Sequence, residues 1–403
     1  MKINIQSKII GLILIGLSIL TFAGIIYYNS IRSVQPLIFS NNAMIYELWQ
    51  AYKKEYIEIG SNRTLDRSRN NLTTSEGESY TMLRAVWEDD KDTFDKSWAW
   101  TKQYLTRKDD HLFSWMYGQK SDGTYGVITE QGGENSASDA DTDIALALVF
   151  ASQKWQDKTF MESAKLIIAD IWDKEVVTIK DKPVLAADNL EKLSQEKYVV
   201  NPSYFAPYSY KIFSKIDIKN DWLGLADNSY AIINQLSKDN LDKTKSEGLV
   251  PDWVVYSAAT GEIIPTYYSN LSSNYSYDAM RTSWRLALDY KWNNDPRAKE
   301  ALQNFSLLTE KYNTDKALYS SYSHDGKTVI SDESPAIYGG DLGYFIVVDP
   351  ANAKDIYEKK LEVLYQPDLQ AWKNILSYYD DNWAWFGMAL YGNDLENLAA
   401  DLK

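Results

Sequence analysis

The feature that most constrains the fold is an unbroken series of segments with helical periodicity, from about residue 43 to the C-terminus. Apolar residues recur at helical spacing in one segment after another, and no linker or low-complexity tract interrupts them. Residues 144–155 are apolar nearly all round, which predicts a helix buried on every side. A double ring of helices, with buried inner and amphipathic outer members, would satisfy that requirement. We therefore expect residues 43–403 to form one all-α domain, with a small β-hairpin at 176–187 as the main exception.

The N-terminal region predicts a membrane anchor. Residues 9–28 carry no charge, and a helix of that length matches the ~30 Å hydrocarbon core of a bilayer. Because Lys2 and Lys8 precede this stretch, the positive-inside rule places residues 1–8 in the cytoplasm. The stretch 9–28 would then be a single transmembrane helix and 29–42 a short stalk, with the main domain outside the cell. The alternative is a secreted protein whose signal peptide is cleaved after Ala23.

Composition excludes several classes of function. The formal net charge is −14 and the chain has no basic block, so we expect no nucleic-acid partner. With no Cys and only two His, the chain has no thiolate nucleophile and too few imidazoles for a multi-histidine metal centre. We expect neither a metal nor a cofactor, and we interpret His111 as a hydrogen-bonded structural residue. Carboxylate chemistry remains, and the 14 Trp and 30 Tyr suggest a groove lined with flat rings.

The first of three acidic sites is the stretch "TTSEGESYTMLRAVW", residues 73–87. Ser75 and Glu78 have the spacing of a capping box at a helix start. That role leaves Glu76 unassigned, next to Gly77, which allows a close approach of the backbone. A carboxylate that only stabilises the helix dipole is the structural alternative for Glu76.

The second site is "SASDADTDIALALVFASQKW", residues 136–155. Ser136 or Ser138 can cap the helix, and Asp141 and Asp143 fall in its first turn, where the dipole favours negative charge. Three Asp within five residues also repel one another, so capping alone does not explain Asp139. A site that binds sugar hydroxyls would use such acceptors directly.

The third site is "NYSYDAMRTSWRLALDYKW", residues 274–292. If its helix starts near Tyr277, Asp278 lies on one face with Arg281 and Arg285. A salt bridge at a helix start is the structural interpretation. The functional interpretation is that an Arg neighbour keeps Asp278 ionised, as a general base requires.

Residues 137–155 resemble the signature of glycoside hydrolase family 8, from Asp139 through Trp155, whose side chain we place in the core. Further blocks resemble that family in the same order, so that the similarity spans roughly residues 43–395. These blocks are "TTSEGESYTMLRAVW", "DHLFSWMYG", "NPSYFAPYSYKIF", "LVPDWV", "YDAMRTSWRLALDY" and "YYDDNWAWFGMALY".

The resemblance implies an (α/α)6 barrel with an acidic groove and endo-acting, inverting hydrolysis of β-1,4-linked polysaccharides. By motif match, Glu76 takes the position of the proton donor, Asp278 that of the base and Asp139 that of the sugar-binding carboxylate. Inverting enzymes need one protonated and one ionised carboxyl group ~6.5–9.5 Å apart. Asp139 could raise the pKa of Glu76 by its like charge. A cellulose-like or mixed-linkage β-glucan is the expected substrate, with xylan and chitosan as alternatives.

Aromatic residues in the matched blocks are the expected stacking surfaces for sugar rings. The substrate-binding candidates are Trp115, Tyr204, Tyr277, Arg281 and Tyr378. The anchor suggests a monomer at the cell surface that trims an exported polysaccharide, with a polysaccharide synthase or export system as partner. Two rival hypotheses are a catalytically weak glycan-binding protein that guides an exported chain on the same barrel, and a polysaccharide lyase, which would favour a basic groove.

Overall fold

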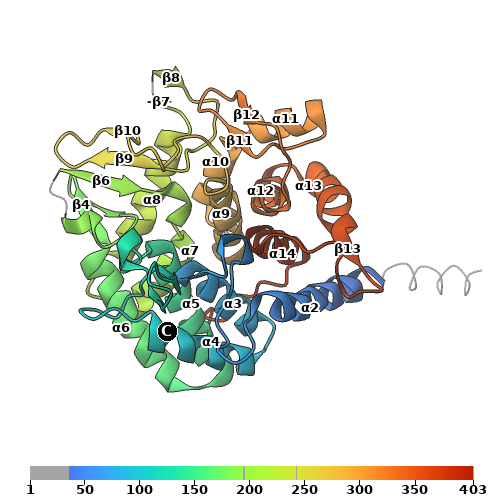
Figure 1. Cartoon of the computed structure of the whole chain (residues 1–403). Coiled ribbons are helices and arrows are strands. Elements are labelled where there is room, and N and C mark those ends of the chain that lie inside the picture. Colours follow the sequence, from blue (N-terminus) through green and yellow to red (C-terminus); the bar gives the residue numbers. More distant parts are fainter. Residues whose placement is uncertain (1–35, 194–195, 242, 403) are drawn as a thin grey trace, which may run out of the picture.

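The computed structural model describes residues 36–193, 196–241 and 243–402, and helices dominate them (Figure 1). The predicted transmembrane segment 9–28 lies outside these residues. Among the described helices, none is both long and apolar enough to cross a bilayer. Helix α2 begins at Pro36, inside the segment 29–42 that we expected to be a stalk.

Of the helices that the structure describes, six are buried along nearly their whole length, and each is followed or preceded by a helix with one buried face. The buried helices are α3 (Ser75–Trp87), α5 (Ser138–Trp155), α7 (Pro207–Ile216), α9 (Met280–Asn293), α12 (Pro335–Val348) and α14 (Tyr378–Gly392). The others are α2 (Pro36–Tyr56), α4 (Lys91–Tyr104), α6 (Lys158–Lys174), α8 (Trp222–Leu236), α10 (Pro296–Gln303), α11 (Leu307–Asp315) and α13 (Pro350–Ile356). This alternation of buried and amphipathic helices is the one that the sequence predicted.

Side-chain oxygens start many of these helices. Thr74 caps α3 by accepting a hydrogen bond from the Gly77 amide, and Asp90, Asp157 and Asp221 cap α4, α6 and α8 in the same way. Each cap satisfies a backbone N–H that the first turn of a helix leaves without a partner. The helix starts are therefore specified locally.

Glycines let α9, α12 and α14 approach at backbone distance. A Cβ added at Gly339 of α12 would lie 2.0 Å from the carbonyl oxygen of Trp383 on α14, and one at Gly343 would lie 2.5 Å from that of Ser283 on α9. Gly387 of α14 in turn faces the backbone of Gly339. Only residues without a side chain fit at these crossings.

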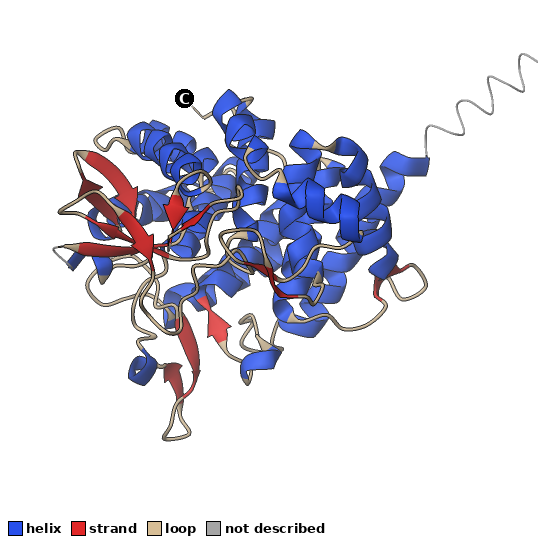
Figure 2. Ribbon diagram, turned by 90° about the horizontal axis from the view of Figure 1, so that it is seen from above, coloured by secondary structure: helices blue, strands red, loops and turns tan. Residues whose placement is uncertain are grey.

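The connections carry short antiparallel strands, and Figure 2 shows them gathered toward one side of the helical body. The predicted hairpin is confirmed as β4 (Val176–Ile179) with β5 (Lys182–Leu185). Two three-stranded sheets were not predicted. They are β1 (Thr73–Thr74) with β2 (Met116–Gln119) and β3 (Tyr125–Val127), and β10 (Ile263–Pro265) with β9 (Val254–Ser257) and β6 (Lys197–Val200).

The remaining described strands, each of two or three residues, pair into three hairpins. These are β7 (Asn240–Leu241) with β8 (Thr244–Lys245), β11 (Ser321–Tyr322) with β12 (Thr328–Ile330), and β13 (Tyr365–Gln366) with β14 (Ala371–Trp372). Segments this short show little periodicity in the sequence, because alternation needs at least four residues to be recognised. The expected all-α domain is thus mainly helical, with small sheets in its connections.

Candidate active site

Glu76 lies in the first turn of α3, directly after strand β1, and its side chain is 22% exposed. The predicted capping box is wrong, because Thr74 rather than Ser75 caps the helix. Glu78 points away from the cap and accepts hydrogen bonds from the Thr64 amide at 2.7 Å and the Ser97 hydroxyl at 2.5 Å. Of the two glutamates, only Glu76 faces the other carboxylates described below.

Asp139 lies in the first turn of α5, with its side chain only 4% exposed. The caps predicted for this helix are also wrong: its N-cap is Ala137, and the Ser138 hydroxyl donates instead to the Ala186 carbonyl at 2.6 Å. Ser136 donates to Glu175 at 2.5 Å. The hydroxyls therefore tie α5 to the β4–β5 region.

The other two carboxylates of α5 have structural partners. Asp141 accepts a hydrogen bond from the Phe113 amide at 3.0 Å, and Asp143 forms a buried ion pair with Arg285 of α9 at 2.8 Å. Asp141 falls in the first turn of α5 as predicted, whereas Asp143 lies beyond that turn. Arg285 was predicted to share a face with Asp278, and it pairs with α5 instead.

Asp278 lies in the turn before α9, which begins at Met280 rather than near Tyr277. The predicted pair with Arg281 is present, at 2.5 Å between Asp278 Oδ1 and Arg281 Nη2. Asp252 shapes this turn by accepting hydrogen bonds from the amides of Ser276 and Ala279, at 2.9 and 2.7 Å. The Asp278 side chain is 30% exposed, so it is open to small molecules.

Arg281 joins all three carboxylates that the sequence singled out. Its Nη1 donates to Glu76 Oε2 at 3.1 Å and to Asp139 Oδ2 at 2.9 Å, while Nη2 contacts Asp278. The guanidinium is 1% exposed, and its Nε donates to the Ser203 hydroxyl at 3.1 Å. A planar fork with five donors can bridge several oxygens in this way, in a fixed geometry that a Lys ammonium does not provide.

Burial and charge set the protonation of the two carboxyls on Arg281 Nη1. Burial raises the pKa of Glu76 to about 7; the Arg281 guanidinium opposes that rise, and the negative charge of Asp139 adds to it. Burial likewise raises the pKa of Asp139, again against the effect of Arg281. Glu76 is therefore partly protonated near neutral pH, as a proton donor needs to be.

Aromatic rings surround the carboxylates. The Tyr378 hydroxyl donates to Glu76 Oε1 at 3.4 Å, and the Tyr204 ring lies 5.1 Å from the guanidinium carbon of Arg281. Tyr277 is 41% exposed, and its hydroxyl lies 3.1 Å from that of Ser320. The structure thus places three of the predicted aromatic residues in or beside the carboxylate group.

Trp115 occupies a different environment. Its indole N–H donates to the Gly132 carbonyl at 2.9 Å, and its ring packs on the small cluster of Leu72, Met116 and Ile128.

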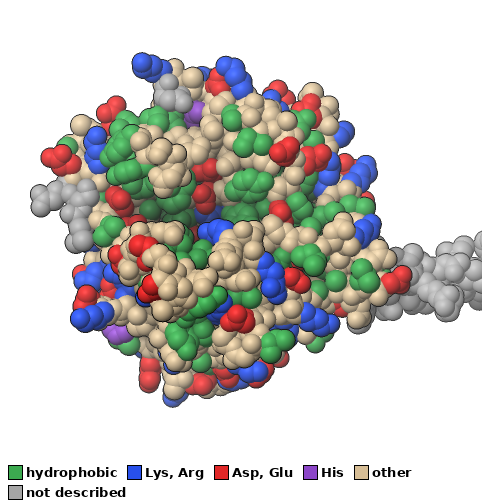
Figure 3. Space-filling model, in the orientation of Figure 1, with side chains coloured by type: hydrophobic (Ala, Val, Ile, Leu, Met, Phe, Trp, Pro, Cys, Tyr) green, Lys and Arg blue, Asp and Glu red, His purple; other side chains and the backbone are tan. Residues whose placement is uncertain are grey.

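The face of the molecule drawn in Figure 3 is hollowed across its middle, with hydrophobic side chains along the hollow and acidic and basic side chains within it.

The sequence of this chain matches a known protein family. The sequence model for glycosyl hydrolases family 8 matches residues 27–382. The chain belongs to glycosyl hydrolases family 8. Endoglucanase A of Acetivibrio thermocellus is 30% identical over 332 residues, which cover 80% of this chain and 64% of that protein. This family 8 chain therefore spans just under two thirds of that relative's length.

Solved structures share the fold. The β-1,3-1,4-glucanase from Paenibacillus sp. X4 aligns with a TM-score of 0.72 and 23% identity, over 87% of this chain and 92% of that one. The endo-1,4-D-glucanase from Vibrio fischeri ES114 aligns with a TM-score of 0.70 and 22% identity, over 85% and 94%. At this level of identity the likeness concerns the architecture of the family 8 domain.

Sequence reasoning missed several residues of the site. Trp253 donates its indole N–H to Asp278 Oδ2 at 2.8 Å, and Tyr379 donates its hydroxyl to the Tyr277 carbonyl at 2.6 Å. The Tyr80 hydroxyl lies 3.5 Å from Arg281 Nη1. All three lie in blocks that resemble family 8. Their place in these blocks, rather than their residue type, could have identified them as residues of the site.

The remaining predictions concern residues outside the site. His111 is hydrogen-bonded, with Nδ1 2.6 Å from Asp170, and it does not approach the carboxylates. Trp155 packs on the core and donates to Asp89 at 2.8 Å. Within the described ranges, no group of three or more acidic or His side chains has the arrangement of a metal site.

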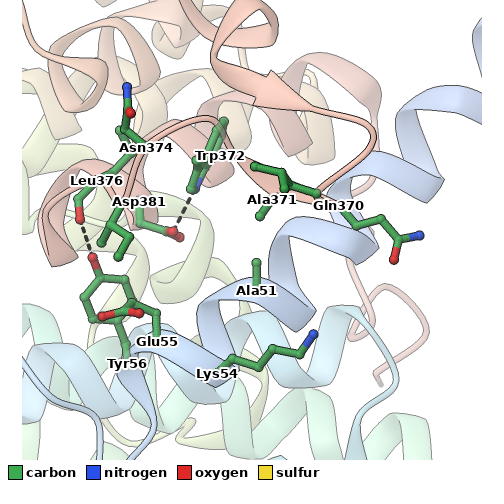
Figure 4. A pocket seen from close by; sticks show the side chains of 12 residues that line it. Ala51, Lys54, Glu55, Tyr56, Gln370, Ala371, Trp372, Asn374, Leu376 and Asp381 are labelled. Carbon is green, nitrogen blue, oxygen red and sulfur yellow. Dashed lines mark hydrogen bonds between the residues drawn. The ribbon is translucent and has the colours of Figure 1, made fainter.

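A separate cavity of about 200 Å³ lies between α2 and the segment around β14 (Figure 4). At its wall, the Tyr56 hydroxyl donates to the Leu376 carbonyl, and Trp372 donates to Asp381 at 2.7 Å. Asp381 also pairs with Arg84 of α3 at 3.0 Å. The side chains around this cavity thus join α2, α3 and α14.

Proposed function

We propose that this protein is an endo-acting, inverting glycoside hydrolase that cleaves β-1,4 linkages in a β-glucan, on an (α/α)6 barrel. The observation that carries the proposal is the shared guanidinium of Arg281, which holds Glu76, Asp139 and Asp278 in one place. The alternation of buried and amphipathic helices supports the barrel. A surface that only binds glycans has no need of this arrangement.

In this mechanism Glu76 is the general acid and Asp278 the general base. Glu76 gives its proton to the glycosidic oxygen as the bond from that oxygen to the anomeric carbon breaks. Asp278 takes a proton from a water molecule whose oxygen forms the new bond from the opposite side of the sugar. The Arg281 guanidinium lies between Glu76 and Asp278 and donates a hydrogen bond to each of them. Inverting enzymes hold their two carboxyl groups ~6.5–9.5 Å apart, so that a water molecule fits between the base and the sugar.

Asp139 would bind a hydroxyl of the sugar at the cleavage point. Its Oδ2 accepts from the same Arg281 nitrogen as Glu76 Oε2, and its charge contributes to the raised pKa of Glu76. Tyr204, Tyr277, Tyr378 and Arg281 are the proposed substrate contacts of the centre, and Trp115 would contribute a more distant stacking surface. The similarity to an endoglucanase and to a β-1,3-1,4-glucanase supports a β-glucan substrate.

The test is hydrolysis of soluble mixed-linkage glucan and carboxymethyl cellulose by the wild type and by Glu76→Gln. We expect the substitution to lower kcat by about 10²–10⁴-fold, because it removes the acid and keeps the shape. Glu78→Gln is the matched control, since Glu78 lies on the same helix, is buried and bonds away from the site. Equal activity of wild type and Glu76→Gln would contradict the proposal.

The product reports the stereochemistry and the substrate class. Proton NMR of the first product should show the α-anomer, because inversion of a β-linkage gives an α-hemiacetal. A β-anomer would contradict the assignment of Asp278 as a base. A panel with xylan and chitosan would separate the alternative substrates, and unsaturated products would indicate a lyase.

We further propose that residues 9–28 anchor a monomer in the cell membrane with residues 43–403 outside, next to a polysaccharide synthase or export system. The support is the uncharged stretch between basic flanks. Cell fractionation followed by N-terminal sequencing tests the anchor. Recovery from the medium of a protein that begins at Gly24 would contradict it.

A further inference from the structure

The two oxygens of Asp278 are held by two different donors. Arg281 Nη2 contacts Oδ1 at 2.5 Å, and the indole N–H of Trp253 donates to Oδ2 at 2.8 Å. Two donors on separate oxygens fix both the position and the rotation of a carboxylate, whereas one donor leaves rotation about the last bond open. The lone pairs that remain on Asp278 therefore point in a set direction.

Trp253 is itself held on three sides. It immediately precedes β9, the central strand of the β10–β9–β6 sheet. Its amide donates to the Ser272 carbonyl at 2.9 Å, and its carbonyl accepts from the Ser273 hydroxyl at 2.8 Å. Its ring meets the Tyr204 ring edge to face, at 5.5 Å and 73°.

These contacts close a ring around Asp278. Arg281 lies over Tyr204, Tyr204 meets Trp253, Trp253 bonds Asp278, and Asp278 bonds Arg281 again. Each member is therefore held by two others, and the carboxylate cannot turn without displacing a packed ring. Preorganisation of this kind keeps a catalytic group in its productive geometry without cost during the reaction.

We propose that Trp253 is a positioning residue that aims the Asp278 carboxylate at the attacking water. The inference rests on the proposed function, in which Asp278 is the base. Trp253 acts through Asp278, since its only polar side-chain atom is directed at that carboxylate. It specifies the direction in which the base accepts a proton.

Other charged and titratable groups also face Asp278 and bear on its protonation. They are Arg281, Glu76, Asp252, Tyr204 and Tyr379. A substitution at Trp253 removes none of these groups. A change in the pH dependence of such a variant is then attributable to the lost indole donor.

The experiment compares the full-length wild type with Trp253→Phe, which removes the N–H and keeps an apolar ring. We expect kcat on soluble mixed-linkage glucan to fall about tenfold, as part of the ~10²–10⁴-fold that a general base contributes, with KM within about twofold. The acidic limb of the kcat/KM profile should move to higher pH, because a donor that stabilises the carboxylate is gone. The α-anomer should remain the first product.

Trp372→Phe is the matched control. Trp372 also donates an indole N–H to an aspartate, Asp381, at 2.7 Å, but at the α2 side of the molecule. This variant should lower the melting temperature and leave kcat and the acidic limb unchanged. It separates the effect of losing an indole–carboxylate bond in general from the effect of losing it at the base.

The outcomes are distinguishable. A wild type without hydrolase activity would contradict the proposed function. An active wild type whose Trp253→Phe variant keeps kcat and the acidic limb would contradict only the role of Trp253. A variant that raises KM and keeps kcat would show that the ring binds sugar instead, and a variant that changes only the melting temperature would show a structural role; each result would overturn the inference.

Discussion

Glu76 and Asp278 accept hydrogen bonds from the two terminal nitrogens of one buried guanidinium, at 3.1 and 2.5 Å. The guanidinium belongs to Arg281, three residues beyond Asp278, whereas Glu76 comes from a different inner helix. The relative position of the proposed acid and base therefore depends on one side chain. A displacement of Arg281 would move both carboxylates at once.

The first prediction concerns the alkaline limb of the activity profile. Because the pKa of Glu76 is about 7, the acid is protonated below that pH and loses its proton above it. We expect kcat/KM to fall as pH rises through about 7. Asp139→Asn removes the like charge that helps to raise the pKa of Glu76, so this limb should move to lower pH. An unchanged limb in Asp139→Asn would show that Asp139 does not influence the acid.

The second prediction concerns Arg281. Arg281→Met leaves three carboxylates around a buried space without their cation, and removal of one partner from a buried ion pair costs about 3–5 kcal/mol. We expect a loss of that order in the free energy of unfolding at pH 7, measured by urea denaturation. Arg281→Lys keeps the charge but not the planar fork, so it should recover part of the stability and little of the activity. Equal activity of Arg281→Lys and wild type would contradict this role.

The third prediction concerns Asp141, which is fully buried in the first turn of α5. Burial raises its pKa to about 8, and it faces the buried carboxyl of Glu175, with which it can share one proton. The folded protein thus keeps a proton that the unfolded chain releases above a pKa of ~3.9. The free energy of unfolding should therefore decrease as pH rises from about 4 toward 8.

Asp141→Asn tests this sign, because an amide resembles the protonated acid. We expect the stability of the variant relative to the wild type to rise by about 3–4 kcal/mol from pH 5 to pH 8, because only the wild type must take up a proton on folding over this range. Thermal melts at the two pH values are sufficient. Asp143→Asn is the control, since it breaks the ion pair with Arg285 and should destabilise the protein at both.

The fourth prediction concerns the crossing of α12 and α14. Gly339→Ala places a Cβ 2.0 Å from the Trp383 carbonyl oxygen, which is backbone and cannot rotate away. The helices must separate, and overpacking of this kind costs about 1–3 kcal/mol. Gly123→Ala is the comparison for added bulk: no heavy atom lies within 4 Å of its new Cβ, although its φ of +84° adds strain of its own. A melting temperature equal to that of the wild type in Gly339→Ala would contradict the close crossing.

The sequence predicted what is local. The helices follow from apolar periodicity, the hairpin of β4 and β5 from its short alternating strands, and the Asp278–Arg281 pair from a spacing of three residues. Each of these features is determined within one turn or one hairpin. The local sequence pattern was therefore sufficient to predict these three features.

The errors concern helix caps and side chains that bond to another segment of the chain. Ser75 and Ser138 have the sequence context of helix caps, but α3 begins one residue earlier than expected, with Thr74 as its cap, and the Ser138 hydroxyl donates to the distant Ala186 carbonyl. Arg285 was placed with Asp278 because helical spacing allows it, yet it pairs with Asp143 on another inner helix. Spacing along one helix does not report which helix lies opposite, so Trp253 and these pairs could not be predicted without the fold.

The hydrogen bond from Tyr56 to the Leu376 carbonyl also has a mechanical consequence. Tyr56 ends α2, Leu376 leads into α14, and Tyr378 in the first turn of α14 reaches Glu76. Two hydrogen bonds and one short segment of chain thus connect the end of α2 with Glu76. The support of Glu76 therefore extends to a peripheral helix, because Tyr56 ends α2 and its hydroxyl holds the segment that leads into α14.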